Sequence, residues 1–316
     1  MRPTIRSLCS GYGGLEMAVE HVTDGVLVDH AETDKRAAMV HDAHWPGVPN
    51  IGDITTIDWS MLEPTDILCA GFPCQPISVA GQRKVTNDAR WLWPHIAHAV
   101  RVLRPRHVVL ENVPPLLRLW RDDDGRWNRA PVEEVAGDLA AVGYVGSWRS
   151  LRAADIGAPH ERERVFIVAS DTQRLGLEGR RGLRRAPREG EAGAHHQGVA
   201  DAGSGRLQAG PGIGHLAPEG DLQAMDDPDR LGVRDWGAFA AAIRRWERLT
   251  RPAPEPSDEK GRLAPAFVEW MMGLPAGWVT DVGLSHTAQL HVLGNGVVPQ
   301  QAFAALNDLF RERGAA

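Results

Sequence analysis

Residues 1–170 alternate between short apolar runs and longer amphipathic stretches, and this alternation restricts the fold more than any other feature. The apolar runs predict strands at Thr4–Cys9, Gly25–Ala31, Asp66–Ala70, His107–Glu111 and Arg164–Ala169. The stretches between them predict helices at Leu15–His21, Lys35–His44, Trp91–Leu103 and Val132–Ala141. Because this order is typical of βαβ units, we expect an α/β domain with a parallel sheet and helices on both faces.

The composition is that of an ordinary globular protein. The 316 residues are 43% hydrophobic and 24% charged, which is enough for one large domain or two. No apolar run approaches the roughly 20 residues of a membrane span, and the N-terminus lacks a signal-peptide pattern. With Cys9, Cys69 and Cys74 as its three cysteines, the chain is suited to a reducing compartment. We therefore expect a cytoplasmic protein that does not enter a membrane.

The middle of the chain differs from both ends. Glycines are frequent and large apolar residues are scarce from residue 171 to about 229, so this stretch is expected to be rich in loops. Between Arg174 and Arg188 six arginines accompany one acid, which fits either a solvated loop or contact with phosphates. One face of a short helix is predicted by Trp236, Phe239, Ile243 and Trp246. We expect a first catalytic part over 1–170, an insert over 171–260, and a segment over 261–316 that completes the first domain and ends in a helix at Pro299–Arg311.

A cysteine follows directly after a proline in Gly71-Phe72-Pro73-Cys74-Gln75. The preceding apolar run places this thiol at the carboxyl end of a strand, the edge where open α/β sheets bind ligands. A thiol attacks as the thiolate, so its ordinary pKa of about 8.5 must be lowered or bypassed. A core position is the alternative, because free cysteines are often buried. A metal held by Cys69 and Cys74 is disfavoured, since no second pair follows at zinc-site spacing.

Three features of the first 60 residues suggest a nucleoside-containing cofactor. The glycine-rich turn Ser10-Gly11-Tyr12-Gly13-Gly14 lies between the first strand and the first helix, where backbone can approach a ligand closely. Glu32 follows the second strand, where such folds place an acid for ribose hydroxyls. Asp53 and Ile54 are expected to end a third strand and to hold an adenine edge. The spacing of the glycines disfavours NAD.

Further candidates lie at later strand ends. Glu111 ends an apolar strand, and an unpaired buried carboxylate is costly enough to suggest a function. Arg162 and Arg164 flank the next strand, although Glu161 and Glu163 also allow a surface ladder of ion pairs. A tight turn is expected in Gly294-Asn295-Gly296-Val297-Val298-Pro299, before the last helix.

Taken in order, these motifs resemble those of the bacterial and phage cytosine-5 DNA methyltransferases. The resemblance covers residues 5–170 and 260–312, and the glycine-rich insert falls where that family has its variable target-recognition region. Its motifs in this chain are Ser10-Gly11-Tyr12-Gly13-Gly14-Leu15-Glu16, Pro73-Cys74-Gln75, Glu111-Asn112-Val113, Arg162-Glu163-Arg164, Arg262-Leu263-Ala264-Pro265, Met272-Gly273-Leu274-Pro275 and Gly294-Asn295-Gly296-Val297-Val298. The fold it implies is the Rossmann-like sheet of the S-adenosylmethionine-dependent methyltransferases, with a small loop-rich insert.

The resemblance also implies a mechanism. The Cys74 thiolate would add to carbon 6 of a flipped-out cytosine and so make carbon 5 nucleophilic. Glu111 would protonate or hydrogen-bond the ring at N3, and Asn112 would orient the loop. Arg162 and Arg164 would hold the cytosine carbonyl and nearby backbone.

The cofactor implied is S-adenosylmethionine, without a metal. It would lie across Gly11 and Gly13, with Glu32 on its ribose and Asp53 and Ile54 around its adenine. Further pocket residues implied are Cys9, where the family usually has phenylalanine, and Pro73, Leu92, Asn295 and Val297. We expect a monomer that acts on double-stranded DNA, with a cognate restriction endonuclease as a possible partner in the cell.

Two other functions remain open from the sequence. A catalytically silent relative would bind DNA or a partner enzyme, and the presence of Cys74, Glu111 and both arginines argues against it. An RNA substrate is the other alternative, but the transfer-RNA branch of the family carries a Cys-Phe-Thr signature that this chain lacks.

Overall fold

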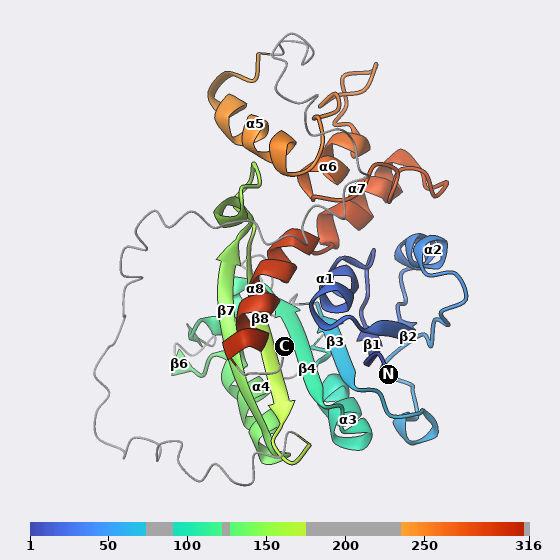
Figure 1. The fold of residues 1–316 in the computed structure, drawn as a ribbon, viewed down its shortest axis with the longest axis vertical. Coiled ribbons are helices and arrows are strands. Elements are labelled where there is room, and N and C mark those ends of the chain that lie inside the picture. The colour runs from blue at the N-terminus through green and yellow to red at the C-terminus, as the bar shows by residue number, and fades with distance from the viewer. Residues whose placement is uncertain (74–90, 122–126, 175–234, 313–316) are drawn as a thin grey trace.

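A mixed six-stranded sheet forms the centre of the computed structural model, which describes residues 1–73, 91–121, 127–174 and 235–312 (Figure 1). The strands stand in the order β2-β1-β3-β4-β8-β7. Their bounds are β1 (Thr4–Leu8), β2 (Val26–Ala31), β3 (Ile67–Gly71), β4 (His107–Asn112), β7 (Tyr144–Arg152) and β8 (Glu163–Asp171). A separate small sheet pairs β5 (Trp120–Arg121) with β6 (Trp127–Asn128).

Helices cover both faces of the large sheet, as predicted. The described α-helices are α1 (Gly14–Thr23), α2 (Lys35–His44), α3 (Trp93–Leu103), α4 (Pro131–Ala141), α5 (Ala240–Leu249), α6 (Pro265–Met271), α7 (His286–Asn295) and α8 (Pro299–Glu312), of which α1 and α8 cover one face and α3 and α4 the other. On β3, Ile67 and Cys69 face the core under α1 and α8, whereas Leu68 and Ala70 face the core under α3 and α4. This two-faced alternation gives the sheet its two apolar layers and confirms the α/β fold class.

The sheet is not parallel throughout, and in this respect the prediction was wrong. Strand β8 runs antiparallel to both β4 and β7. Only residues 153–162 connect β7 to β8, and a parallel crossover needs a dozen or more residues. Strand β7 itself was not predicted, because it is an edge strand with mostly half-buried or exposed side chains and no long apolar run.

The strand expected to end at Asp53 and Ile54 was also wrong. The backbone there makes a single bridge, between His30 and Asn50, and then turns. The Asp53 carboxylate accepts hydrogen bonds from the backbone N–H of Thr55 at 2.9 Å and from its hydroxyl at 2.8 Å. Such local side-chain bonds compete with strand pairing and favour a turn.

A separate apolar cluster packs α5 against α6. Ile243 and Trp246 of α5 are buried against Trp270 of α6, as the predicted helical face required, while Phe239 is 68% exposed.

Most of the arginine-rich stretch and the rest of the predicted loop-rich insert, residues 175–234, lie outside the described residues. None of the helices described is both long and apolar enough to cross a membrane.

Two histidines are stacked in the interior between β2 and α2. The rings of His30 and His41 are fully buried with centroids 3.6 Å apart, and none of their four nitrogens has a hydrogen-bond partner among the described residues. Burial, with the neighbouring histidines, lowers the pKa of His41 from 6.5 to about 3. The fold therefore requires the neutral imidazole.

Acid should weaken the fold at this stack. Because the pKa of His41 is lower in the folded chain, its contribution is fully present above pH 6.5 and is lost as the pH falls towards 3. We expect the free energy of unfolding to drop by roughly 2 kcal/mol between pH 7 and pH 5 from this group. His41→Leu should remove most of that drop, measured by urea unfolding at both pH values. His98→Leu, which removes an exposed imidazole on α3, is the control, and an unchanged acid sensitivity in His41→Leu would refute the assignment.

Candidate functional site

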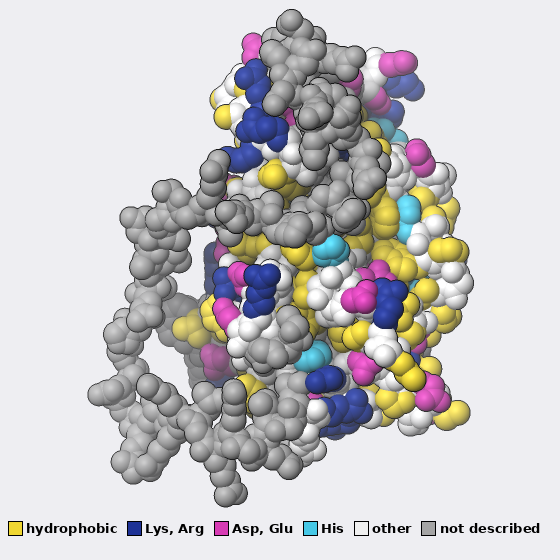
Figure 2. Space-filling view, viewed as in Figure 1, with side chains coloured by type: hydrophobic (Ala, Val, Ile, Leu, Met, Phe, Trp, Pro, Cys, Tyr) yellow, Lys and Arg dark blue, Asp and Glu magenta, His cyan; other side chains and the backbone are white. Residues whose placement is uncertain are grey.

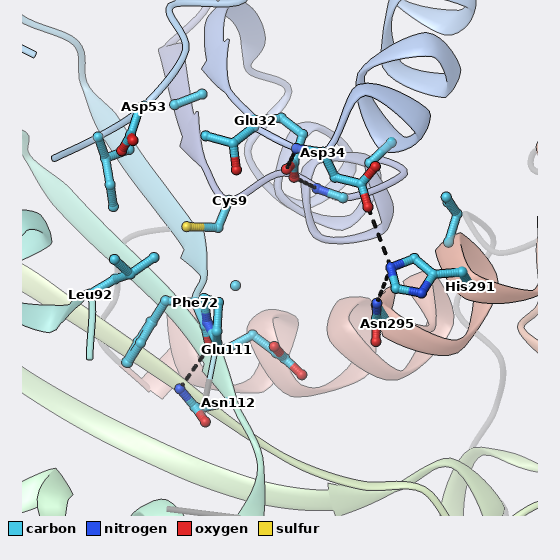
Figure 3. Close-up of a pocket in the computed structure, with 18 of the residues that line it drawn as sticks. Cys9, Glu32, Asp34, Asp53, Phe72, Leu92, Glu111, Asn112, His291 and Asn295 are labelled. Carbon is cyan, nitrogen blue, oxygen red and sulfur yellow. Dashed lines mark hydrogen bonds and ion pairs between the residues drawn. The ribbon is translucent and has the colours of Figure 1, made fainter. Parts of the chain in front are cut away.

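The main candidate site is a cavity of about 640 Å³ at the carboxyl ends of β1, β3 and β4 (Figure 3). Strand β1 lies between β2 and β3, so the loops that follow β1 and β3 diverge. Such a switch in strand order opens a crevice in doubly wound sheets. The wall opposite this edge is formed by the last turn of α7, from the other end of the chain.

One end of the cavity is built around Glu32. Its carboxylate accepts hydrogen bonds from the backbone N–H of Gly11 at 2.8 Å and of Asp34 at 2.8 Å, and so ties together the loops after β1 and β2. Gly11 has a φ of 58°, and a Cβ built on it would meet no atom within 4 Å. The Gly11 backbone therefore borders open space that a ligand can fill.

Asp53 and Cys9 add two further polar groups to the cavity wall. The hydrogen bonds from Thr55 lower the pKa of Asp53, so its carboxylate is ionised at neutral pH. Burial, assisted by the nearby acid Glu32, raises the pKa of the Cys9 thiol to about 12. Cys9 is therefore a neutral thiol in the cavity wall rather than a nucleophile.

The other end of the cavity holds an ion pair. Nε of Arg164 lies 2.9 Å from a carboxylate oxygen of Glu111, and both side chains are largely buried. Burial raises the pKa of Glu111 above its ordinary value, and the two arginines oppose this shift. Nearby, the side-chain amide of Asn112 donates to the carbonyl of Phe72 at 3.2 Å, which fixes the turn after β3.

Arg162 lies away from the cavity wall and holds backbone instead. Its guanidinium donates to the carbonyl of Gly294 at 3.2 Å and to that of Gly296. The Tyr12 hydroxyl donates to the neighbouring carbonyl of Val297 at 2.6 Å. These bonds fix the turn between α7 and α8 against the glycine-rich loop.

The structure brings most of the predicted site residues to one place. The cavity is lined by Cys9, Gly11, Glu32, Asp53, Ile54, Pro73, Leu92, Glu111, Asn112, Arg164 and Asn295. Gly13 caps α1 and packs against Trp45, and Val297 packs beside Tyr12, so neither lines it. Cys74 lies outside the described residues.

Sequence reasoning missed several further residues of the wall, among them Thr33, Asp34 and His291. Asp34 could have been found as the residue that caps α2. His291 precedes Asn295 by four residues, a spacing that shares one helical face, but α7 itself was not predicted.

Two solved structures that resemble this chain are methyltransferases. The Dnmt2 methyltransferase of S. pombe aligns over 99% of both chains with a TM-score of 0.58 and 14% identity. The methyltransferase EhMeth of Entamoeba histolytica aligns over 99% of both chains with a TM-score of 0.60 and 15% identity. At such identities the likeness establishes the fold, which is the methyltransferase fold that the motifs implied.

The family follows from the sequence itself. Residues 4–181 match the family model described as C-5 cytosine-specific DNA methylase, and the chain belongs to that family. The Type II methyltransferase M.HgiCII of Herpetosiphon aurantiacus is 35% identical over 174 residues, which cover 54% of this chain and 37% of the relative. The Type II methyltransferase M.NgoBI of Neisseria gonorrhoeae is 38% identical over 162 residues, covering 51% of this chain and 48% of the relative. The matches therefore span less than half the length of these relatives.

A buried acid lies beneath the glycine-rich loop. The Glu16 side chain is fully buried, accepts a hydrogen bond from the Ser7 hydroxyl, and has one oxygen without a partner among the described residues. Burial raises its pKa from 4.5 to about 7. The folded chain therefore favours the protonated acid.

Removing this charge should stabilise the protein in alkaline solution. The contribution of Glu16 is fully present below pH 4.5 and is lost as the pH rises through 7, because the unfolded chain ionises first. Glu16→Gln should therefore raise the free energy of unfolding by up to about 3 kcal/mol at pH 8, with a gain that vanishes towards pH 4.5. Urea unfolding across this range measures it, with Glu20→Gln on the same helix as the control. A gain independent of pH would contradict the assignment.

Proposed function

We propose that this chain is a DNA cytosine-5 methyltransferase, which transfers a methyl group from S-adenosylmethionine to carbon 5 of a cytosine in double-stranded DNA. One observation carries the proposal. A single cavity holds two carboxylates suited to a nucleoside, Glu32 and Asp53, together with a buried Glu111–Arg164 pair suited to a pyrimidine ring. Membership of the C-5 cytosine-specific DNA methylase family is consistent with a cofactor site and a site for cytosine in one cavity.

The residues at the first end fit the cofactor. Glu32 would accept hydrogen bonds from ribose hydroxyls, and Asp53 with Ile54 would hold the adenine. Gly11 lines the cavity, and the ligand has room against its backbone because a Cβ built there would meet no atom within 4 Å. When bound, S-adenosylmethionine supplies an electrophilic methyl group. Leu92, Pro73 and Asn295 would complete the walls.

The residues at the second end fit the target base. Burial raises the pKa of Glu111 and so eases its protonation; the protonated acid would donate to the cytosine ring at N3 and stabilise charge as it develops. Arg164 holds Glu111 in place and would donate to the carbonyl of the base. Arg162, which we expected to contact the base, would act by fixing the turn at residues 294–296.

Cys74 is the proposed nucleophile. Its thiolate would add to carbon 6 of the cytosine, which makes carbon 5 able to attack an electrophilic methyl group. Loss of the proton at carbon 5 to a base or water would then release Cys74 and restore the ring. Because carbon 6 is inaccessible within a duplex, we propose that the target base is flipped out of the stack.

Helix α5 offers a surface for the DNA backbone. Arg244 and Arg248 lie one turn apart and are exposed, and Figure 2 shows dark blue side chains gathered over α5. Arginines on one helix face suit phosphate contacts.

The Type II relatives make a cognate restriction endonuclease our proposed partner in the cell, and the monomeric state stays a prediction.

Replacing Cys74 should abolish methyl transfer while leaving the fold intact. Cys74→Ser is expected to lower the transfer of tritiated methyl groups to duplex DNA by about 1,000-fold or more, because serine is a far weaker nucleophile. A duplex containing 5-fluorocytosine should form a covalent adduct with the native chain but not with the variant, measured by mass spectrometry. Cys69→Ala removes a buried core thiol and is the control.

Three results would contradict this proposal. Methyl transfer that survives Cys74→Ser would exclude Cys74 as the nucleophile. Transfer to RNA rather than to duplex DNA would favour the alternative substrate. A native chain that binds DNA but neither methylates it nor binds S-adenosylmethionine would be a silent relative.

The α5 surface should contribute to the salt dependence of DNA binding. Each phosphate contact adds about 0.9 to the slope of log K against log salt concentration, so Arg244→Ala with Arg248→Ala should reduce that slope by about 2. Fluorescence anisotropy with a labelled duplex measures the slope. Arg101→Ala removes an exposed arginine of α3, far from α5 in Figure 1, and is the control. An unchanged slope in the double variant would exclude α5 from the interface.

A further inference from the structure

A histidine on the last turn of α7 forms part of the cavity wall. His291 lies one helical turn before Asn295, and Nε2 of its ring is 3.2 Å from the side-chain nitrogen of Asn295. The same ring nitrogen is 3.4 Å from a carboxylate oxygen of Asp34 (Figure 3). All three side chains line the cavity, so this contact joins walls from opposite ends of the chain.

The walls of the cavity are otherwise strongly acidic. Its described lining residues include the carboxyl groups of Glu32, Asp34, Asp53 and Glu111 but only two basic side chains, Arg164 and His291. Arg164 contacts Glu111 at 2.9 Å, at the end of the cavity proposed for the base. A ligand with a negatively charged group would therefore find its basic partner at His291.

Asp34 does not need His291 to balance its charge. Its carboxylate lies 2.6 Å from the guanidinium of Arg36 and caps the start of α2. Hydrogen bonds from Arg36 lower the pKa of Asp34 to about 2. His291 can therefore turn from Asp34 towards a ligand without leaving that carboxylate unpaired.

The order of groups along the cavity matches the order of groups in an adenosyl amino acid. In Figure 3, Asp53 and His291 lie on opposite sides of Glu32. Glu32 accepts a hydrogen bond from the backbone N–H of Asp34 at 2.8 Å, and Asp34 in turn contacts His291. If Asp53 faces adenine and Glu32 the ribose, the group attached beyond the ribose faces His291.

We propose that His291, with the side chain of Asn295, binds the carboxylate of the amino-acid end of the cofactor and selects adenosyl ligands that carry one. This inference rests on the proposed function, because it assumes an adenosyl ligand in the cavity. A carboxylate accepts from an imidazole N–H and from an amide N–H, and such charge-assisted bonds are stronger than neutral ones.

Isothermal titration calorimetry with two adenosyl ligands tests the inference without requiring catalysis. S-Adenosylmethionine carries the carboxylate, and decarboxylated S-adenosylmethionine lacks only that group. We expect the native chain to bind the first roughly tenfold more tightly than the second. His291→Ala should weaken S-adenosylmethionine by about that factor and leave its decarboxylated form roughly unchanged.

Two further variants separate recognition from a loss of structure. His291→Lys places a cation and N–H donors at this position and should retain part of the preference for the carboxylate. His286→Ala removes the first histidine of the same helix, which contacts the carbonyl of Leu263 outside the cavity, and should leave both affinities unchanged.

The outcomes distinguish this inference from the proposed function. Equal weakening of both ligands by His291→Ala, or no weakening of either, would overturn the role of His291 while the adenosyl site stands. A native chain that binds neither ligand, nor 5′-methylthioadenosine, would overturn the proposed function and this inference together.

Discussion

The cavity exists because two distant parts of the chain meet at Tyr12. Its hydroxyl donates to the carbonyl of Val297, and its ring packs so closely on Gly296 that a Cβ there would lie 1.7 Å from a ring carbon. Gly14 approaches the carbonyl of Val297 in the same way. These glycines are required by close packing rather than by a ligand. Because Arg162 holds the same turn from the β8 side, the wall that carries His291 is fixed relative to the loops after β1 and β2.

Local environment shifts the pKa values of two carboxyl groups of this region, Asp53 and Glu111, in opposite directions. Asp53 lies on the surface of a turn, and hydrogen bonds from Thr55 lower its pKa. Glu111 is buried, and its pKa is raised even though Arg164 lies beside it. Such a difference places an ionised acceptor at one end of the cavity and a potential proton donor at the other. This division is what a cavity that binds a nucleoside and activates a pyrimidine ring requires.

The sequence was sufficient where a local pattern determines the structure. Apolar runs predicted β1 to β4 and β8, and the residues that follow β1 to β4 were correctly expected at one edge. The sequence was insufficient where the surroundings of a segment determine its structure. Strand β7 was missed because it is an edge strand without an apolar run. The strand expected to end at Asp53 is a turn, because the Asp53 side chain accepts hydrogen bonds from the local backbone. The position of Arg162 depends on the turn at residues 294–296, which is more than 130 residues away in the chain, and no local pattern encodes that contact. His291 was missed for the same reason, because α7 has a weak apolar face and Asp34, which His291 contacts, lies near the other end of the chain.

The central claim is that one cavity accepts both an adenosyl ligand and a cytosine. The most direct measurement is a crystal structure of the chain with S-adenosylhomocysteine and a duplex that contains 5-fluorocytosine. We predict adenosyl density between Asp53 and Glu32, and a flipped cytosine against Glu111 and Arg164 that is bonded covalently to Cys74. Ligand density outside the cavity, or a stacked and unmodified cytosine beside an occupied adenosyl site, would contradict the account.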